Sequence, residues 1–370
     1  MGGDKSDRLL SRRELLACAA AAGVVAAVRP ASLLAGEAQP AALPVQEHAV
    51  AYGRDWSKIR GFNYQPSYGS SGFELWQKFD AKTIRMELER GKKYFPHINA
   101  IRFWLSWDSF VRNPKRFAAN FEMALVIADG LQLAVLPVLF NRWHDQVLDY
   151  GGIYIDHFLP GSSGMQNPGL FDAYLAAIAG GHKDDPRILA WDLCNEPYSY
   201  NGPPSKIPEI LAAETAWLKR LYSVCKAMAI KAPITVGIHP GVPLERTEAI
   251  SDVLSIHPYW MHNDAGANKG AYERQLDDNV AFANRVKKPI LATECCWGSL
   301  DDAVRVESVR YTLTQLKRRN IGWLVYLLHH SLIADAHRPQ FGPLGFPGNL
   351  AFIEADDSLR PGHEVYNEFP

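Results

Sequence analysis

The chain has 370 residues, of which 47% are hydrophobic and 11% aromatic, so it is long enough to bury one large core. Its 39 basic and 40 acidic residues give a formal net charge of −1, and no long run of basic residues occurs beyond short groups such as Lys92-Lys93 and Lys287-Lys288. This balance argues against nucleic acid and strongly acidic surfaces as partners.

Residues 1–38 have the pattern of an export signal. Arg12 and Arg13 precede an apolar run over residues 15–28, and small residues at 36–38 offer a cleavage point. The arginine pair resembles the twin-arginine signal of bacteria, and the apolar run is short for a bilayer span. We therefore expect the signal to be removed from a periplasmic or secreted protein, and a retained anchor is the alternative.

Residues 39–49 are predicted to be an Ala/Pro-rich linker, and residues 50–370 one folded domain without a stable membrane span. Short apolar runs in this domain predict β-strands at Lys58–Tyr64, Ala100–Leu105, Leu133–Leu139, Ile188–Asn195, Ile234–Ile238, Val253–His257, Ile290–Glu294 and Gly322–Leu328. These runs are continuous, as in parallel strands buried on both faces. Helical patterns between them include Ala81–Lys93, Arg116–Gly130, Pro168–Gly180, Ile207–Ala229, Tyr272–Val286 and Leu300–Arg319. Eight strands alternating with helices predict a single α/β domain, a closed (β/α)8 TIM barrel.

Long segments without periodicity follow three of the predicted strands, at Asn141–Asn167, His257–Ala271 and His329–Asn349. In a barrel, loops after strands lie on the C-terminal face, where substrates bind. The fifth helix is weakly signalled, because Val242–Ile250 is short and contains Pro243.

Two groups of residues raise the question of a metal. Beyond the signal the chain has four cysteines, Cys194, Cys225, Cys295 and Cys296. They show no CxxC spacing, which favours buried free thiols or one disulfide over a zinc site. A polar cluster follows the eighth strand and contains His329, His330, Asp335 and His337. Its spacing does not define a ligand set, so a solvated loop is favoured and no metal cofactor is expected.

The clearest chemical signal is a pair of glutamates, each at the end of a predicted strand. Alternation along the fourth strand points both Asp192 and Glu196 into the barrel, and Glu196 comes last, at the mouth. Pro197 cannot donate to the sheet and helps to end the strand there. Glu294 ends the seventh strand in the same way, across the barrel. The two carboxylates can therefore converge on one ligand, whereas Asp192 lies deeper and is expected to be structural.

Asn195-Glu196-Pro197 at strand four and Glu294 at strand seven resemble the glycoside hydrolases of clan A, and the remaining pattern is most similar to family 5, the cellulase-like family. The resemblance implies a retaining β-glycoside hydrolase with Glu196 as acid/base and Glu294 as nucleophile, acting on β-linked glucan or mannan-type carbohydrates. A glycosidic bond breaks through an oxocarbenium-like state, so one carboxyl group protonates the leaving oxygen while a carboxylate attacks the anomeric carbon. Retaining enzymes hold these groups roughly 5–5.5 Å apart.

The resemblance also gives roles to residues beside the pair. Arg102, which closes the second strand, would hold Glu294 ionised, and the alternative is a structural pair with Asp192. Asn195 would bind the sugar 2-hydroxyl.

His257 and Tyr259 match the His-x-Tyr of family 5 at strand six, where the tyrosine orients the nucleophile and the histidine lines the acid/base side.

Two places depart from the family pattern. After strand three, either Asn141 or His144 could take the place of the expected histidine. At strand eight, Tyr326 stands where the family has a tryptophan platform, and Trp323 lies deeper.

Aromatic side chains near strand ends could stack on sugar faces: Tyr64, Trp104, Trp107, Trp143, Trp260 and Trp297. Trp104 and Trp297 are the stronger candidates, because they follow Arg102 and Glu294 closely. A non-catalytic carbohydrate-binding barrel is the alternative to an enzyme, and a metal-dependent hydrolase ranks below both. The sequence leaves open the sugar, its linkage, internal or terminal cleavage, and the oligomeric state.

Overall fold

The computed structural model describes residues 43–142, 152–153, 155–159, 161–162, 167–198, 207–260, 268–335 and 349–370. The predicted export signal and the first residues of the predicted linker lie outside this part of the chain. One compact unit begins at Leu43 and runs to Pro370. Within the described residues, no helix is both long and apolar enough to cross a bilayer.

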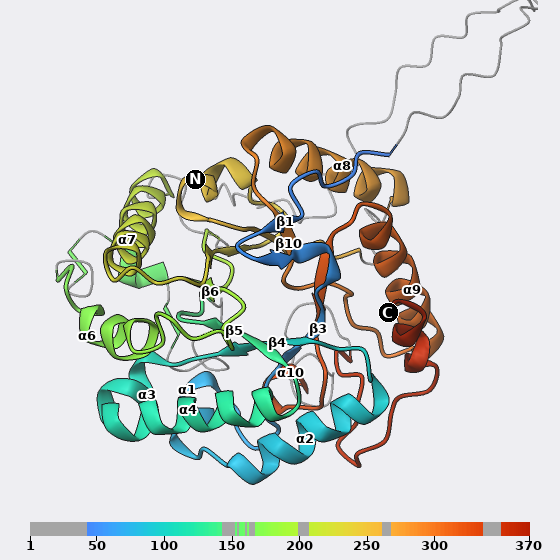
Figure 1. The fold of residues 1–370 in the computed structure, drawn as a ribbon, viewed down its shortest axis with the longest axis horizontal. Helices are drawn as coiled ribbons and strands as arrows, with labels where there is room; N and C mark the ends of the chain where they lie inside the picture. The colour runs from blue at the N-terminus through green and yellow to red at the C-terminus, as the bar shows by residue number, and fades with distance from the viewer. Residues whose placement is uncertain are drawn as a thin grey trace, which may run out of the picture. The chain divides into compact units, whose positions relative to one another are not determined.

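A parallel sheet forms the centre of this unit (Figure 1). Its strands are β3 (Arg60–Tyr64), β4 (Ala100–Trp104), β5 (Ala134–Val138), β6 (Trp191–Asp192), β7 (Ile234–Thr235), β8 (Gly237–Ile238), β9 (Leu254–Ile256), β10 (Ile290–Ala292) and β11 (Gly322–Val325). The order is β7-β6-β5-β4-β3-β11-β10-β9-β8. Because β7 and β8 are successive parts of one segment, parted only by Val236, the sheet closes on itself. The predicted (β/α)8 barrel is confirmed, and every strand of this sheet lies within a predicted run.

Helices surround the sheet in Figure 1, and their sequences explain where they begin. The main ones are α2 (Ala81–Tyr94), α4 (Pro114–Gly130), α7 (Ile207–Ala227), α8 (Lys269–Val286) and α9 (Asp302–Arg318). Asp80, Asn113, Asn268 and Asp301 each accept a backbone N–H of the following turn, as N-cap residues do. In α8, Lys287 ends the helix in the left-handed conformation.

Two predicted helices are shorter or tighter than expected. The stretch predicted at Pro168–Gly180 contains α6 (Asp172–Leu175), continued by a π-helical turn, η3 (Ala176–Gly180). After strand five, the weakly signalled helix consists of two 3-10 turns, η5 (Leu244–Arg246) and η6 (Glu248–Ile250). Smaller elements complete the described chain: β1 (Val50–Ala51), β2 (Arg54–Asp55), η1 (Trp56–Lys58), α1 (Gly72–Gln77), α3 (Trp107–Arg112), η2 (Ile155–Phe158), α10 (Leu332–Asp335) and η7 (His363–Glu368).

The N-terminal end of the barrel is closed by apolar side chains. Trp56 of η1 is fully buried and packs with Ile59, which directly precedes β3, and with Leu136 and Leu324 of β5 and β11. Gln46 connects the segment before β1 to the barrel. Its backbone N–H donates to the carbonyl of Arg319, and its side-chain oxygen accepts a hydrogen bond from the N–H of Ile290. With this end filled, the polar side chains gather at the opposite end of the strands.

Candidate active site

Glu196 lies just beyond the end of β6, in an unusual backbone conformation. Its φ is +48°, in the left-handed region that residues other than glycine seldom adopt. Two backbone contacts hold this segment in place. Asn195 forms a parallel β-bridge with Asn141, which follows β5, and the N–H of Glu196 donates to Gly237 O at 2.8 Å. This conformation turns the Glu196 carboxylate into the barrel mouth, where 13% of the side chain stays exposed. Strained backbone of this kind is often found at functional sites.

Glu294 follows β10, and each of its carboxylate oxygens has a hydrogen-bond donor. Arg102 Nη1 donates to Oε1 at 2.5 Å, and the Tyr259 hydroxyl donates to Oε2 at 2.7 Å. Only 7% of the Glu294 side chain is exposed. These two hydrogen bonds, one to each oxygen, fix the orientation of the carboxylate.

His257 links the two glutamates. Its Nδ1 lies 2.7 Å from Glu196 Oε1 and 3.6 Å from Glu294 Oε2, and the ring is fully buried. One oxygen of each glutamate and a ring nitrogen of His257 all lie within 4.8 Å of one another. The structure thus brings the two predicted carboxylates and the predicted histidine together at one point of the mouth.

Arg102 contacts both of the carboxylates considered as its partners. Besides Glu294, its Nη2 donates to Asp192 Oδ2 at 2.8 Å and to Asn195 Oδ1 at 2.7 Å, and its Nη1 donates to Asn63 Oδ1 at 3.0 Å. Burial alone lowers the pKa of Arg102, but the charges of Asp192 and Glu294 outweigh it and raise the pKa. The guanidinium therefore stays charged and joins the deeper carboxylate to the one at the mouth.

Tyr259 is held as a neutral donor. Burial and the nearby charges of Glu294 and Glu196 raise its pKa well above that of an exposed phenol. Trp297, which is half-buried, packs its ring edge-on against Tyr259 with centroids 5.3 Å apart. The tyrosine is thus oriented both by the carboxylate it binds and by the predicted aromatic neighbour.

Of the two candidates after strand three, Asn141 lies in the described site. Its side-chain oxygen accepts a hydrogen bond from Asn195 Nδ2 at 2.9 Å. Asn195 is therefore held between Asn141 and Arg102, with its amide fixed beside Glu196. His144 lies outside the described residues.

At strand eight, Tyr326 borders the mouth beside Trp104. The two rings meet edge-on, with centroids 6.0 Å apart and an interplanar angle of 90°. The Tyr326 hydroxyl donates to Gln65 Oε1 at 3.3 Å, and the peptide bond after Tyr326 is cis. Trp323 lies deeper, as predicted, fully buried with the Arg60 guanidinium 3.7 Å above its ring. A small hollow beside these residues is lined by Gln65, Trp104, Ser106 and Asn141 among others.

The other aromatic candidates differ in their accessibility. Tyr64 is fully buried and donates to Glu87 Oε2 at 2.6 Å, so it cannot stack on a sugar. Trp260 is buried against Tyr311, and Trp107 is half-buried against Phe171. Trp143 lies outside the described residues. The stacking role predicted for Tyr64 is therefore wrong, because the first strand buries this ring outside the mouth, against Phe103.

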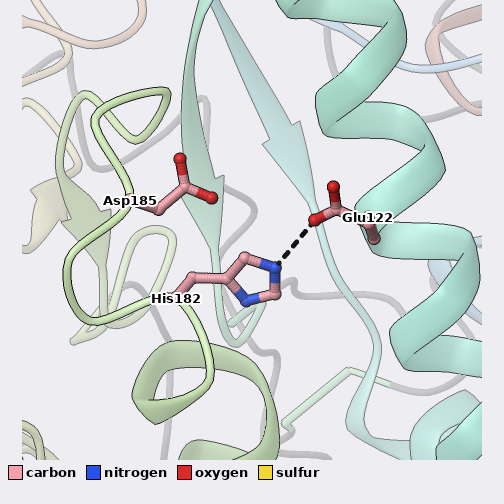
Figure 2. Close-up of side chains that lie close together, drawn as sticks. All are labelled: Glu122, His182 and Asp185. Carbon is pink, nitrogen blue, oxygen red and sulfur yellow. Dashed lines mark hydrogen bonds and ion pairs between the residues drawn. The ribbon is translucent and has the colours of Figure 1, made fainter.

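Two clusters of potential metal ligands occur among the described residues. One is Glu196, His257 and Glu294, in which Arg102 already supplies a positive charge. The other is Glu122, His182 and Asp185, shown in Figure 2, where His182 faces Glu122 of α4. Arg187 donates to both oxygens of Glu122 and both of Asp185. A guanidinium that binds both carboxylates occupies the place a cation would need, so this cluster is an ion-pair network.

The histidines after strand eight belong to neither cluster. His329 is buried, its Nε2 lies 2.7 Å from Arg90 Nη1, and burial lowers its pKa. The side chain of Asp335 and all of His337 lie outside the described residues. Cys194, Cys225, Cys295 and Cys296 are all free thiols and buried, and the sulfurs of Cys295 and Cys296 lie 3.7 Å apart.

Three polar residues of the site were not predicted from the sequence. Asn63 and Gln65 lie at the end of β3, and Thr293 directly precedes Glu294. Asn63 Nδ2 donates to the carbonyls of Thr293 and Leu324 at 2.8 and 2.9 Å. The rule used for the other strands, that polar residues at C-terminal ends face the mouth, would have found Gln65.

Similar structures support the assignment of the fold. No protein-family model and no curated protein matches the chain. A GH5_18 protein from Streptomyces cattleya in complex with GlcNAc aligns with a TM-score of 0.64 and 17% identity, over 84% of this chain and 79% of that one. A GH5_18 protein from Bifidobacterium longum subsp. infantis gives 0.65 and 18%, over 84% and 78%.

The exo-β-1,4-mannosidase Op5Man5 from Opitutaceae bacterium strain TAV5 aligns with a TM-score of 0.64 and 19% identity over 84% of this chain, which spans 58% of its length. These similarities show a shared fold. The chain has a (β/α)8 barrel like those of these three proteins, so the fold implied by the sequence resemblance is confirmed.

Proposed function

We propose that this protein is a retaining β-glycoside hydrolase, with Glu196 as acid/base and Glu294 as nucleophile. The proximity of the two carboxylates, with one oxygen of each within 4.8 Å of the other, supports a single reaction centre. Retaining enzymes need carboxyl groups roughly 5–5.5 Å apart, because one must attack the carbon whose oxygen the other protonates. An inverting enzyme needs a wider gap that admits a water.

The contacts of each glutamate fit the two roles. Glu294, paired with Arg102 and Tyr259, is held as a carboxylate that attacks the anomeric carbon while the bond to the leaving oxygen breaks and Glu196 supplies its proton. Water then attacks the glycosyl ester, Glu196 takes a proton from that water, and Glu294 is released as a carboxylate. His257 Nδ1 lies 2.7 Å from Glu196 Oε1 and orients the carboxyl group that exchanges this proton.

We propose β-linked glucan or mannan-type oligosaccharides or polysaccharides as substrates. Two similar structures have names that concern β-mannosides: the exo-mannosidase Op5Man5, and a variant of the Streptomyces cattleya protein in complex with Manβ1-4GlcNAc. The aromatic side chains of Trp104, Trp297 and Tyr326 at the mouth are suited to the apolar faces of such sugars.

A panel of aryl β-glycosides and of glucan, mannan and xylan oligosaccharides tests the proposal. We expect hydrolysis, with proton NMR showing the β-anomer as the first product. Glu294→Gln should remove turnover while the melting temperature stays close to that of the parent protein. Full activity in that variant, or the α-anomer as first product, would contradict the mechanism. Sugar binding without hydrolysis would favour a non-catalytic binding barrel.

We also propose export to the periplasm or the medium through the N-terminal signal. Mass spectrometry of the protein from fractionated cells should find it outside the cytoplasm, with a new N-terminus near residue 38. A full-length protein that stays in the membrane fraction would support the retained anchor.

A further inference from the structure

Two buried hydroxyl groups lie behind the histidine that contacts Glu196. Ser255 of β9 and Thr293, just after β10, come from neighbouring strands, and Thr293 Oγ1 lies 3.1 Å from His257 Nε2. The Ser255 and Thr293 hydroxyl oxygens are in hydrogen-bond contact with each other. All three side chains are at most 1% exposed. Together with Glu196 they form one hydrogen-bonded chain from the barrel wall to the mouth.

The protons of this hydrogen-bonded series of side chains can be placed by counting donors and acceptors. Each hydroxyl has one proton, and neutral imidazole carries one proton on either nitrogen. Among the described residues, the only acceptor found for the Ser255 proton is Thr293 Oγ1. With that proton in place, Thr293 donates its own to His257 Nε2, so the imidazole proton lies on Nδ1 and is donated to Glu196 Oε1. The reverse order would leave the Ser255 proton without an acceptor, which is costly in a buried site.

We propose that Thr293 is a positioning residue for the acid/base: its hydroxyl fixes the Nδ1–H tautomer of His257, which donates to Glu196 Oε1 and orients this carboxyl group. The catalytic part of this inference rests on the proposed function. The tautomer of the neutral ring depends only on the hydrogen bonds. Thr293 does not touch the substrate in this scheme and acts through His257.

A purely structural role would not require the contact with the ring. A Ser–Thr pair satisfied within the sheet would stabilise β9 and β10 equally well without reaching His257. Thr235 of β7 offers the comparison, because it is also buried and donates only to a backbone carbonyl, that of Val253, at 2.7 Å. Thr235→Val therefore removes a comparable hydrogen bond without affecting the histidine.

Nitrogen-15 NMR of the full chain labelled at histidine tests the tautomer directly, with the His257 signals assigned by difference from His257→Asn. In the parent protein we expect the proton on Nδ1. In Thr293→Val we expect loss of this single tautomer, and Thr293→Ser should restore it. A proton on Nε2 in the parent protein would overturn the proposal without any variant, so it stays falsifiable even if Thr293→Val fails to fold.

The catalytic consequence is tested by comparing kcat for substrates whose leaving groups differ in their need for protonation. Thr293→Val should lower kcat about tenfold for alkyl or sugar leaving groups, which need protonation, and much less for 2,4-dinitrophenyl glycosides. Thr293→Ser should recover most of the loss, and Thr235→Val should leave the ratio unchanged. Equal losses on both substrates would overturn the role in acid catalysis. If the parent protein hydrolyses no glycoside, the proposed function fails, and the NMR result still decides the tautomer.

Discussion

Arg102 and Asp192 form a fully buried ion pair, with Nη2 and Oδ2 2.8 Å apart, and the same guanidinium reaches Glu294. The structural pair and the functional contact, which the sequence presents as alternatives, are therefore parts of one arrangement. The planar fork of arginine makes this feasible, because it directs several donors at fixed angles. A deeper carboxylate thus holds the guanidinium that orients the carboxylate at the mouth.

Arg102→Lys should lower kcat/KM by roughly a hundredfold while the chain stays folded. An ammonium keeps the charge but cannot contact Asp192, Asn195 and Glu294 in the same geometry, and misplacement by about 1 Å can cost that much. Steady-state kinetics on the best aryl glycoside provide the measurement.

The matched control is Arg187→Lys, because Arg187 also bridges two carboxylates, those of Glu122 and Asp185, which Figure 2 shows. This variant should change the melting temperature slightly and leave kcat/KM unaffected. Equal kinetic losses in both variants would show that the effect of Arg102 is not specific to the site.

Tyr259→Phe should reduce kcat about tenfold to a hundredfold, because it removes a hydrogen bond to a charged carboxylate, worth roughly 1.5–3 kcal/mol. Since the pKa of Tyr259 is raised, the phenol keeps its proton and its hydrogen bond to Glu294 as the pH rises past 10, the ordinary pKa of tyrosine. Ionisation of Tyr259 should therefore cause no fall in the rate near pH 10. The pH–rate profiles of the parent protein and of Tyr259→Phe should have the same shape in this range.

Tyr174→Phe is the control for that variant, because Tyr174 is a buried tyrosine that donates only to the carbonyl of Leu139, at 3.0 Å. It should lower stability by about 1 kcal/mol without changing kcat. An unchanged kcat in Tyr259→Phe would remove the orienting role given to this tyrosine.

The sequence was sufficient for the barrel and for the residues that alternation points into its mouth. Continuous apolar runs located the strands, and the strand ends located Glu196 and Glu294, whereas Arg102, expected to close its strand, lies in the middle of β4. Contacts between distant segments could not be predicted, because alternation along a strand indicates the direction of a side chain and not the residue that it contacts. Thr293 illustrates this limit: only the neighbouring strand, with Ser255 and His257, gives its hydroxyl a role. Tyr64 illustrates the converse, since a strand-end aromatic was buried by the helix packed outside it.

Gly237→Ala should impair both stability and activity. A methyl group at this position would lie 2.7 Å from His257 Nε2, 3.0 Å from Asp192 Oδ2 and 3.1 Å from Arg102 Nη2, so the buried network would have to shift. We expect a loss of about 1–3 kcal/mol in unfolding free energy, as for other overpacked sites, and a lower kcat.

Gly130→Ala, at the end of α4, is the control, because its methyl group would meet no atom within 4 Å. Alanine restricts the unfolded chain and should leave the protein equally stable or up to about 1 kcal/mol more stable. Urea denaturation of both variants measures the difference. A neutral Gly237→Ala would mean that the polar residues around it are not tightly packed.

His363 should make the protein less stable in acid. Burial, and then the charges of Arg305 and Arg360, lower its pKa to about 3, whereas in the unfolded chain the pKa is about 6.5. Between these values the unfolded chain binds a proton that the folded protein does not, so the unfolding free energy falls as the pH drops from about 6.5 towards 3. At pH 4 this single group accounts for a loss of order 3 kcal/mol.

His363→Asn keeps a donor for the carbonyl of Pro361, which His363 Nδ1 contacts at 3.1 Å, and cannot be protonated in this range. The unfolding free energy of this variant should decline less between pH 7 and 4 than that of the parent protein, whatever its value at pH 7. His97→Asn, at an exposed position, should keep the parental slope. Urea titrations at a series of pH values decide the matter: parallel curves for the parent and His363→Asn would show that the imidazole of His363 is accommodated equally well in its charged form.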